Sequence, residues 1–82
     1  MTTILIVDDD INILQLVNIH LSEAGFKVLQ AKDGTEALGI LNREVCDLAV
    51  VDVMMPFMDG YALTRVIRNK YDIPVILLTA KN

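Results

Sequence analysis

The chain has 82 residues, of which 54% are hydrophobic and 22% are charged, and its formal net charge is −4. This length allows one domain or part of one, and this hydrophobic content excludes an intrinsically disordered chain. The 7 Lys and Arg against 11 Asp and Glu exclude nucleic-acid binding by this segment itself, because phosphate binding needs clustered basic residues.

The apolar runs and the single cysteine indicate in which cellular compartment the protein is expected. No run approaches the roughly 18 apolar residues of a membrane span, and no signal peptide is visible at the N-terminus. Cys46 cannot form an internal disulfide, and no paired Cys and His spacing suggests zinc. We therefore expect a cytoplasmic domain that does not contact a membrane.

Strands and helices are predicted to alternate along the chain. Three of the four strand-like runs are continuously apolar, which indicates burial on both faces, as in a parallel sheet between helices. Links of two to six residues predict repeated right-handed βαβ units. In chain order we expect a strand at 4–7, a helix with its apolar stripe at 14–24, a strand at 27–30, a helix with its stripe at 37–41, a strand at 48–51, a helix at 61–69 and a strand at 75–78.

Acidic residues follow two of the predicted strands. Asp8, Asp9 and Asp10 come directly after the first strand, and Asp52 comes directly after the third. Ligand groups in an open parallel sheet gather beyond the carboxyl ends of the strands, so these carboxylates converge if the two strands are neighbours. Carboxylates in one pocket repel one another unless a cation or proton intervenes, and a few hard oxygen ligands suit Mg²⁺. The pattern therefore predicts a magnesium site.

The same acidic residues have purely structural interpretations. Asp10 precedes a helix and fits an N-cap better than a ligand. Asp8 and Asp9 could be turn residues, and Asp52 could simply end a strand. Thr79, after the fourth strand, could be an ordinary β-branched strand residue, and its hydroxyl matters only if the pocket exists.

Other reactive side chains are assigned structural roles. His20 has no second ligand at a metal-binding spacing, so we expect a partly exposed helix residue. Three methionines, Met54, Met55 and Met58, are expected to pack the loop after the third strand. Cys46 is expected to be a small buried hydrophobe, because no adjacent basic residue would activate a thiolate.

Three motifs, in order and with matching spacing, resemble the receiver domain of bacterial two-component response regulators over the whole chain. They are ILIVDDD at 4–10, DLAVVDVMMP at 47–56 with MDG at 58–60, and PVILLTA at 74–80. The resemblance implies an α/β fold with a flavodoxin-like, doubly wound parallel sheet, of which a (βα)₃β portion is present with strand order 2-1-3-4. It also implies a fifth strand ending in a lysine and two further helices. Lys81 does not match that lysine because it follows the fourth strand, so we interpret 1–82 as one receiver domain, incomplete at its C-terminus.

The resemblance also implies a role for each site residue. Asp52 matches the phosphoacceptor, and Asp8 and Asp9 match the acidic pair that binds Mg²⁺ together with Asp52. Met54 matches the position whose backbone carbonyl completes the metal site. Thr79 matches the hydroxyl that turns toward the aspartyl phosphate.

The resemblance implies a signalling domain rather than an enzyme that turns over a substrate. Such a domain is a stoichiometric phosphoacceptor: it takes a phosphoryl group from a sensor histidine kinase and changes conformation to control an output. The amino-acid sequence of 72–81 is most similar to that of receivers joined to a winged-helix DNA-binding domain. The expected output is therefore control of transcription, through a domain outside residues 1–82.

Two other functions are weighed against this one, and an assembly is expected. A Mg²⁺-dependent aspartyl phosphohydrolase could use Asp8 and Asp10 as nucleophile and acid, although Asp52 and the loop after it would then be unexplained. A signalling-incompetent fragment or interaction scaffold is the third possibility. An apolar edge at 75–78 is a template for pairing with another chain. We therefore expect the isolated chain to dimerise or swap through the fourth strand, to aggregate, or to exist only as the ordered part of something longer.

Overall fold

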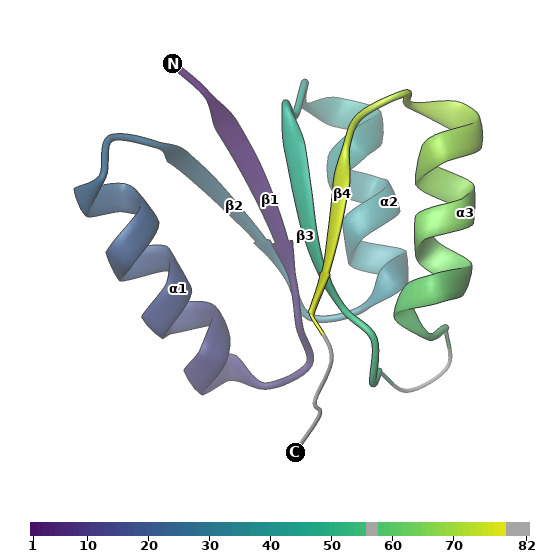
Figure 1. Cartoon of the computed structure of the whole chain (residues 1–82), viewed down its shortest axis with the longest axis horizontal. Helices are drawn as coiled ribbons and strands as arrows, with labels where there is room; N and C mark the ends of the chain where they lie inside the picture. Colours follow the sequence, from purple (N-terminus) through teal and green to yellow (C-terminus); the bar gives the residue numbers. More distant parts are fainter. Residues whose placement is uncertain (56–57, 79–82) are drawn as a thin grey trace.

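A computed structural model describes residues 1–55 and 58–78, which form a parallel four-stranded sheet with helices on both faces (Figure 1). The sheet order is β2-β1-β3-β4, so the predicted fold class and strand order are confirmed. Along the chain the elements are β1 (Thr3–Val7), α1 (Ile11–Glu23), β2 (Lys27–Ala31), α2 (Gly34–Arg43), β3 (Leu48–Asp52), α3 (Gly60–Lys70) and β4 (Val75–Leu78).

Each helix begins at an aspartate that caps its first turn. The carboxylates of Asp10, Asp33 and Asp59 each accept a hydrogen bond from a backbone N–H of the first turn, which satisfies a donor that the helix leaves free. The prediction that Asp10 is an N-cap is therefore confirmed. Ala24 is an exception to the predicted stripe of the first helix: it follows the last helical residue and is exposed, just before Gly25 turns the chain with a φ of 98°.

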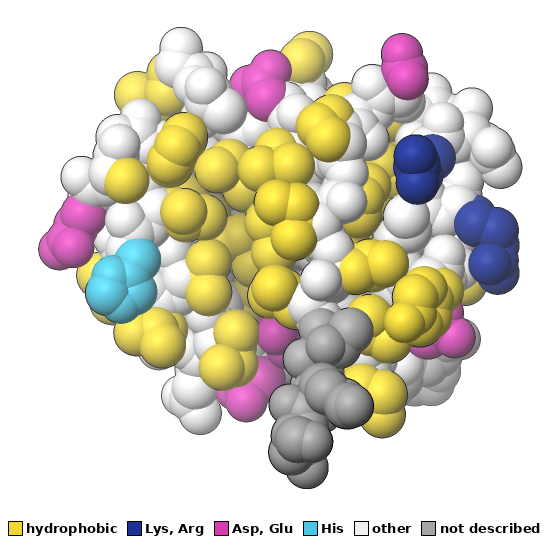
Figure 2. Space-filling model, viewed as in Figure 1, with side chains coloured by type: hydrophobic (Ala, Val, Ile, Leu, Met, Phe, Trp, Pro, Cys, Tyr) yellow, Lys and Arg dark blue, Asp and Glu magenta, His cyan; other side chains and the backbone are white. Residues whose placement is uncertain are grey.

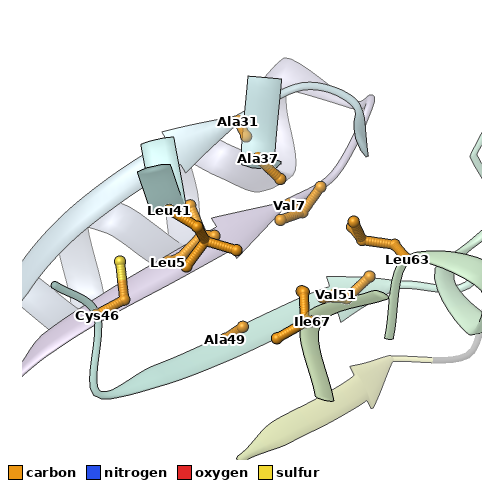
Figure 3. Packing of buried hydrophobic residues seen from close by; sticks show 10 residues of the cluster. All are labelled: Leu5, Val7, Ala31, Ala37, Leu41, Cys46, Ala49, Val51, Leu63 and Ile67. Atoms are coloured by element: carbon orange, nitrogen blue, oxygen red, sulfur yellow. The ribbon is translucent and has the colours of Figure 1, made fainter. Parts of the chain in front are cut away.

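The main core lies between the sheet and helices α2 and α3. Figure 3 shows its side chains, which project from β1 and β3 and from the inner sides of both helices. Leu63 and Ile67 of α3 have no exposed surface, so α3 is firmly attached to the sheet. Cys46 is buried here, as predicted. The buried members are Leu5, Val7, Ala31, Ala37, Leu41, Cys46, Ala49, Val51, Leu63 and Ile67.

In the part of the chain that the structure describes, the opposite face of the sheet carries one helix, α1, which packs against β1 and β2 (Figure 1). Hydrophobic side chains gather over the middle of this face, between α1 and β4 (Figure 2). Two residues of β4, Ile76 and Leu78, are 49% and 40% exposed. The prediction that continuously apolar strands are buried on both faces is therefore wrong for β4, because α1 does not reach it.

Two further expectations concern the outer surface of the molecule. Within the described residues, β4 is the last strand of the sheet on its side, and the dimer expected through it stays a prediction. None of the helices in that part of the chain has the length and apolar character needed to cross a bilayer.

Candidate functional site

Three carboxylates meet at the carboxyl edge of the sheet. β1 and β3 are parallel neighbours, with Val7 opposite Val51, so the next residue of each chain segment lies at the same edge. One carboxylate oxygen from each of Asp8, Asp9 and Asp52 lies within 4.8 Å of the others. The structure thus brings together the acidic residues that the strand ends predict to converge.

Asp8 is the most buried residue of the three, with 7% of its surface exposed. Burial raises its pKa above the ordinary value, and the negative charges of Asp52, Asp9 and Asp10 raise it further. The backbone N–H of Asp10 donates to Asp8 Oδ1 at 2.9 Å and partly offsets this rise. Over 1–55 and 58–78, neither salt bridge formed by the chain involves Asp8, Asp9 or Asp52. Among the residues that the structure describes, no ion pair therefore offsets the repulsion between these carboxylates.

Apolar side chains complete the open pocket around these carboxylates. Met54 is 66% exposed at its rim, so the prediction that this methionine packs the loop is wrong, whereas Met55 and Met58 do pack against the core. The pocket is lined by Asp8, Asp9, Asp10, Ile13, Asp52, Met54 and Leu78. Sequence reasoning missed Ile13 and Leu78. The register of β4, which places Leu78 opposite Asp52, could have identified the second.

The backbone around Asp52 is held on two sides. The N–H of Val53 donates to the carbonyl of Leu78 in β4 at 3.0 Å, and the carbonyl of Val53 accepts from the N–H of Gly60 at 3.0 Å. Gly60 begins α3 directly after the capping residue Asp59. Hydrogen bonds to β4 and α3 thus fix the chain where it leaves β3, which limits how far Asp52 can shift.

The remaining predicted residues lie away from the carboxylate cluster or outside the described residues. Asp10 lines the pocket, but its carboxylate accepts the N–H of Asn12 at 2.9 Å and caps α1. His20 is exposed on α1, as predicted. Thr79 and Lys81 lie outside the described residues.

Comparisons with known proteins agree with this geometry. Residues 4–82 match the family model described as the response regulator receiver domain. The response regulator GtcR of Aneurinibacillus migulanus is 40% identical over 80 residues, which are 98% of this chain and 33% of that protein. The "Probable transcriptional regulator ycf27" of Cyanophora paradoxa is 48% identical over 77 residues, which are 94% of this chain and 32% of that protein. The chain therefore spans about a third of the length of these relatives.

A solved structure shows the same fold. Response regulator protein TrrA of Thermotoga maritima superposes with a TM-score of 0.93 at 37% sequence identity, covering 100% of this chain and 72% of that one. The family match extends over almost the whole chain and includes both strand ends that carry the carboxylates. The chain belongs to the family of response regulator receiver domains.

Proposed function

We propose that this chain accepts a phosphoryl group on Asp52 from a sensor histidine kinase, with Mg²⁺ in the acidic pocket, and changes conformation to control transcription. The observation that carries the proposal is the cluster of Asp8, Asp9 and Asp52 in an open pocket at the carboxyl edge of the sheet. A pocket that is open to solvent is accessible to a second protein that presents a phosphoryl group. The relatives named as response regulators and transcriptional regulators support the same output.

The side chains present fit a Mg²⁺ ion. Asp8, Asp9 and Asp52 each offer one hard oxygen ligand, and the backbone carbonyl of Met54 is the proposed fourth protein ligand. The raised pKa of Asp8 and the closeness of three like charges indicate a site that gains from a cation. When bound, Mg²⁺ neutralises charge on the transferring phosphoryl group. The solved structure of TrrA holds Mg²⁺ and BeF, which supports this assignment.

Asp52 is the proposed nucleophile. Its carboxylate oxygen forms the new bond to phosphorus while the bond from phosphorus to a histidine nitrogen of the kinase breaks. The freed imidazole nitrogen then takes a proton from solvent, so the exchange needs no other reactant. The product is one aspartyl phosphate per chain, which makes the domain a stoichiometric acceptor rather than a turnover enzyme.

The proposed conformational switch uses the hydroxyl group of Thr79. An aspartyl phosphate offers strong acceptor oxygens, and a hydroxyl that donates to one of them would couple phosphorylation to the loop after β4. This role follows from the family resemblance and stays a proposal for this chain.

The alternative phosphohydrolase has less support. It needs Asp10 as a free acid beside the nucleophile, whereas the Asp10 carboxylate accepts a hydrogen bond as the N-cap of α1. The half-buried Asp52, which shares the cluster with Asp8 and Asp9, would have no part in that reaction.

Labelled phosphate incorporation into the full chain, with a small phosphodonor and Mg²⁺, tests the proposal. We expect one hydroxylamine-sensitive phosphoryl group per chain, lost in Asp52→Asn and after removal of Mg²⁺ by a chelator. Asp33→Asn is the matched control, because Asp33 is also half-buried but caps α2 away from the pocket. Persistent labelling of Asp52→Asn, or continuous release of phosphate from a generic ester, would reject the assignment.

A further inference from the structure

Gly60 lies directly against the backbone of the proposed phosphoacceptor. A Cβ atom at this position would overlap the carbonyl oxygen of Asp52 and would lie 2.7 Å from the Cα of Val53. Both are backbone atoms, which cannot turn aside as the end of a flexible side chain can. The positive φ of Gly25 has no counterpart at Gly60, so the glycine is required here by space and not by backbone conformation.

Neither the start of α3 nor the end of β3 can move easily to make room for a side chain at residue 60. The start of α3 is joined to the sheet by the hydrogen bond from Gly60 to Val53, and one turn later Leu63 is fully buried in the core. On the other side, Asp52 pairs with Leu78 in β4, and Val53 donates to the carbonyl of Leu78. A side chain at residue 60 would therefore displace the peptide group that joins Asp52 to Val53. The contacts of α3 and the hydrogen bonds to β4 both oppose this displacement.

We propose that Gly60 is a positioning residue for Asp52. Its missing side chain lets the first turn of α3 rest on the end of β3, and this contact fixes where the Asp52 carboxylate lies relative to Asp8 and Asp9. The inference rests on the proposed function, because the position of Asp52 matters for binding Mg²⁺ and for attack on phosphorus. Misplacing a reacting group by about 1 Å can cost about a hundredfold in rate.

Two other glycines provide controls of the same chemical type. A Cβ at Gly39, in α2, would meet only the guanidinium of Arg43, at an ordinary 3.5 Å. A Cβ at Gly34 would meet Met58 Sδ at 2.9 Å, which is a flexible side chain in the loop after β3. The structure therefore ranks the three Gly→Ala changes by their effect on Asp52, with Gly60 first, Gly34 second and Gly39 without effect.

The test measures the Mg²⁺ dissociation constant and the phosphorylation rate of the full chain at saturating donor. We expect Gly60→Ala to lower the rate by roughly ten- to a hundredfold and to weaken Mg²⁺ binding, while Gly39→Ala matches the wild type. Ile67→Val is the control for a purely structural role, because it removes a methyl group from the buried side of α3, seven residues after Gly60, where Ile67 packs in the main core. Ile67→Val should lower the unfolding temperature and leave the Mg²⁺ dissociation constant and the phosphorylation rate unchanged.

The outcomes separate this inference from the proposed function. Gly60→Ala with wild-type rate and Mg²⁺ affinity would overturn the positioning role alone. Equal losses in Gly60→Ala and in Ile67→Val would also overturn it, because stability would then explain the effect. Gly39→Ala also favours the helical state of α2, because alanine has a higher helix propensity than glycine. If Gly60→Ala does not fold even when combined with Gly39→Ala, the glycine serves the whole fold and the inference fails. A wild-type chain that takes no phosphoryl group would overturn the proposed function, and this inference with it.

Discussion

The same two strands, β1 and β3, carry two regions of opposite character. Along the strands, Leu5 and Val51 have no exposed surface and pack with α2 and α3. At their carboxyl ends, Asp8 and Asp52 place like charges close together, with Asp8 almost fully buried. The first region stabilises the fold by burying apolar surface, whereas the second lowers stability and is useful only if a cation binds there. Removing a side chain should therefore have opposite effects in the two regions.

The largest effect is expected in the core. Leu63→Ala removes a fully buried side chain that joins α3 to the sheet, and should lower the free energy of unfolding by about 2–5 kcal/mol. Leu16→Ala is the matched control, because Leu16 is 52% exposed on α1 and should change stability by less than about 0.5 kcal/mol. Urea unfolding of both variants of the full chain checks this, and equal losses would contradict the assignment of the main core.

Binding of Mg²⁺ to the acidic region should raise the free energy of unfolding, whereas the core substitution lowers it. An ion that binds the folded chain alone stabilises it by about 2.7 kcal/mol at a concentration of 100 times the dissociation constant. Thermal unfolding in chelator and in a Mg²⁺ series checks this. The gain should disappear in Asp52→Asn if that carboxylate is a ligand, and an equal gain in the variant would exclude it.

Within the acidic run, the two exposed members should differ. Asp9 contributes an oxygen to the cluster, while the Asp10 carboxylate is occupied in capping α1. Asp9→Ala should therefore weaken Mg²⁺ binding about tenfold, or about 1.4 kcal/mol, and more than Asp10→Ala does. Titration calorimetry on the two variants measures the difference. Equal dissociation constants would contradict this division of roles.

The smallest expected effect concerns the pH dependence of stability. Because burial and neighbouring charges raise the folded-state pKa of Asp8, the folded chain binds this proton more tightly than the unfolded chain. Asp8 therefore contributes stability below its ordinary pKa of 3.8, and this contribution is lost as the pH rises through the raised pKa. Without Mg²⁺, Asp8→Asn should flatten that part of the profile and make the chain more stable than the wild type at neutral pH. Unfolding curves from acid to neutral pH measure this. If the free energy of unfolding had the same slope against pH in the wild type and in Asp8→Asn, the prediction would be wrong.

The fold and the acidic cluster could be predicted from the sequence because both depend on strong local patterns. Alternating apolar runs and helical stripes determine the order of elements, and the parallel arrangement brings strand ends to one edge. Asp8, Asp9 and Asp52 follow from that rule once β1 and β3 are neighbours, which the resemblance to receiver domains implies. The capping role of Asp10 was equally readable, because it directly precedes the first helical residue.

The features that were missed depend on contacts between distant segments. The apolar run of β4 does not reveal which residues α1 covers, so the exposure of Ile76 could not be predicted from it. Ile13 joins the pocket through the rotation of α1 against the sheet, which a helical stripe leaves undetermined. The close approach of Gly60 to Asp52 depends on how α3 packs, and the sequence shows only a glycine after a capping aspartate.

At the ends of β1 and β3, the carboxylates of the proposed ion site lower the stability of the chain when no ion is bound. The most direct test compares the free energy of unfolding of the wild type and of Asp8→Asn, each with chelator and with saturating Mg²⁺. We predict that the order reverses: Asp8→Asn is the more stable chain in chelator, and the wild type is the more stable chain in Mg²⁺. The same order under both conditions would show that these carboxylates do not exchange stability for ion binding.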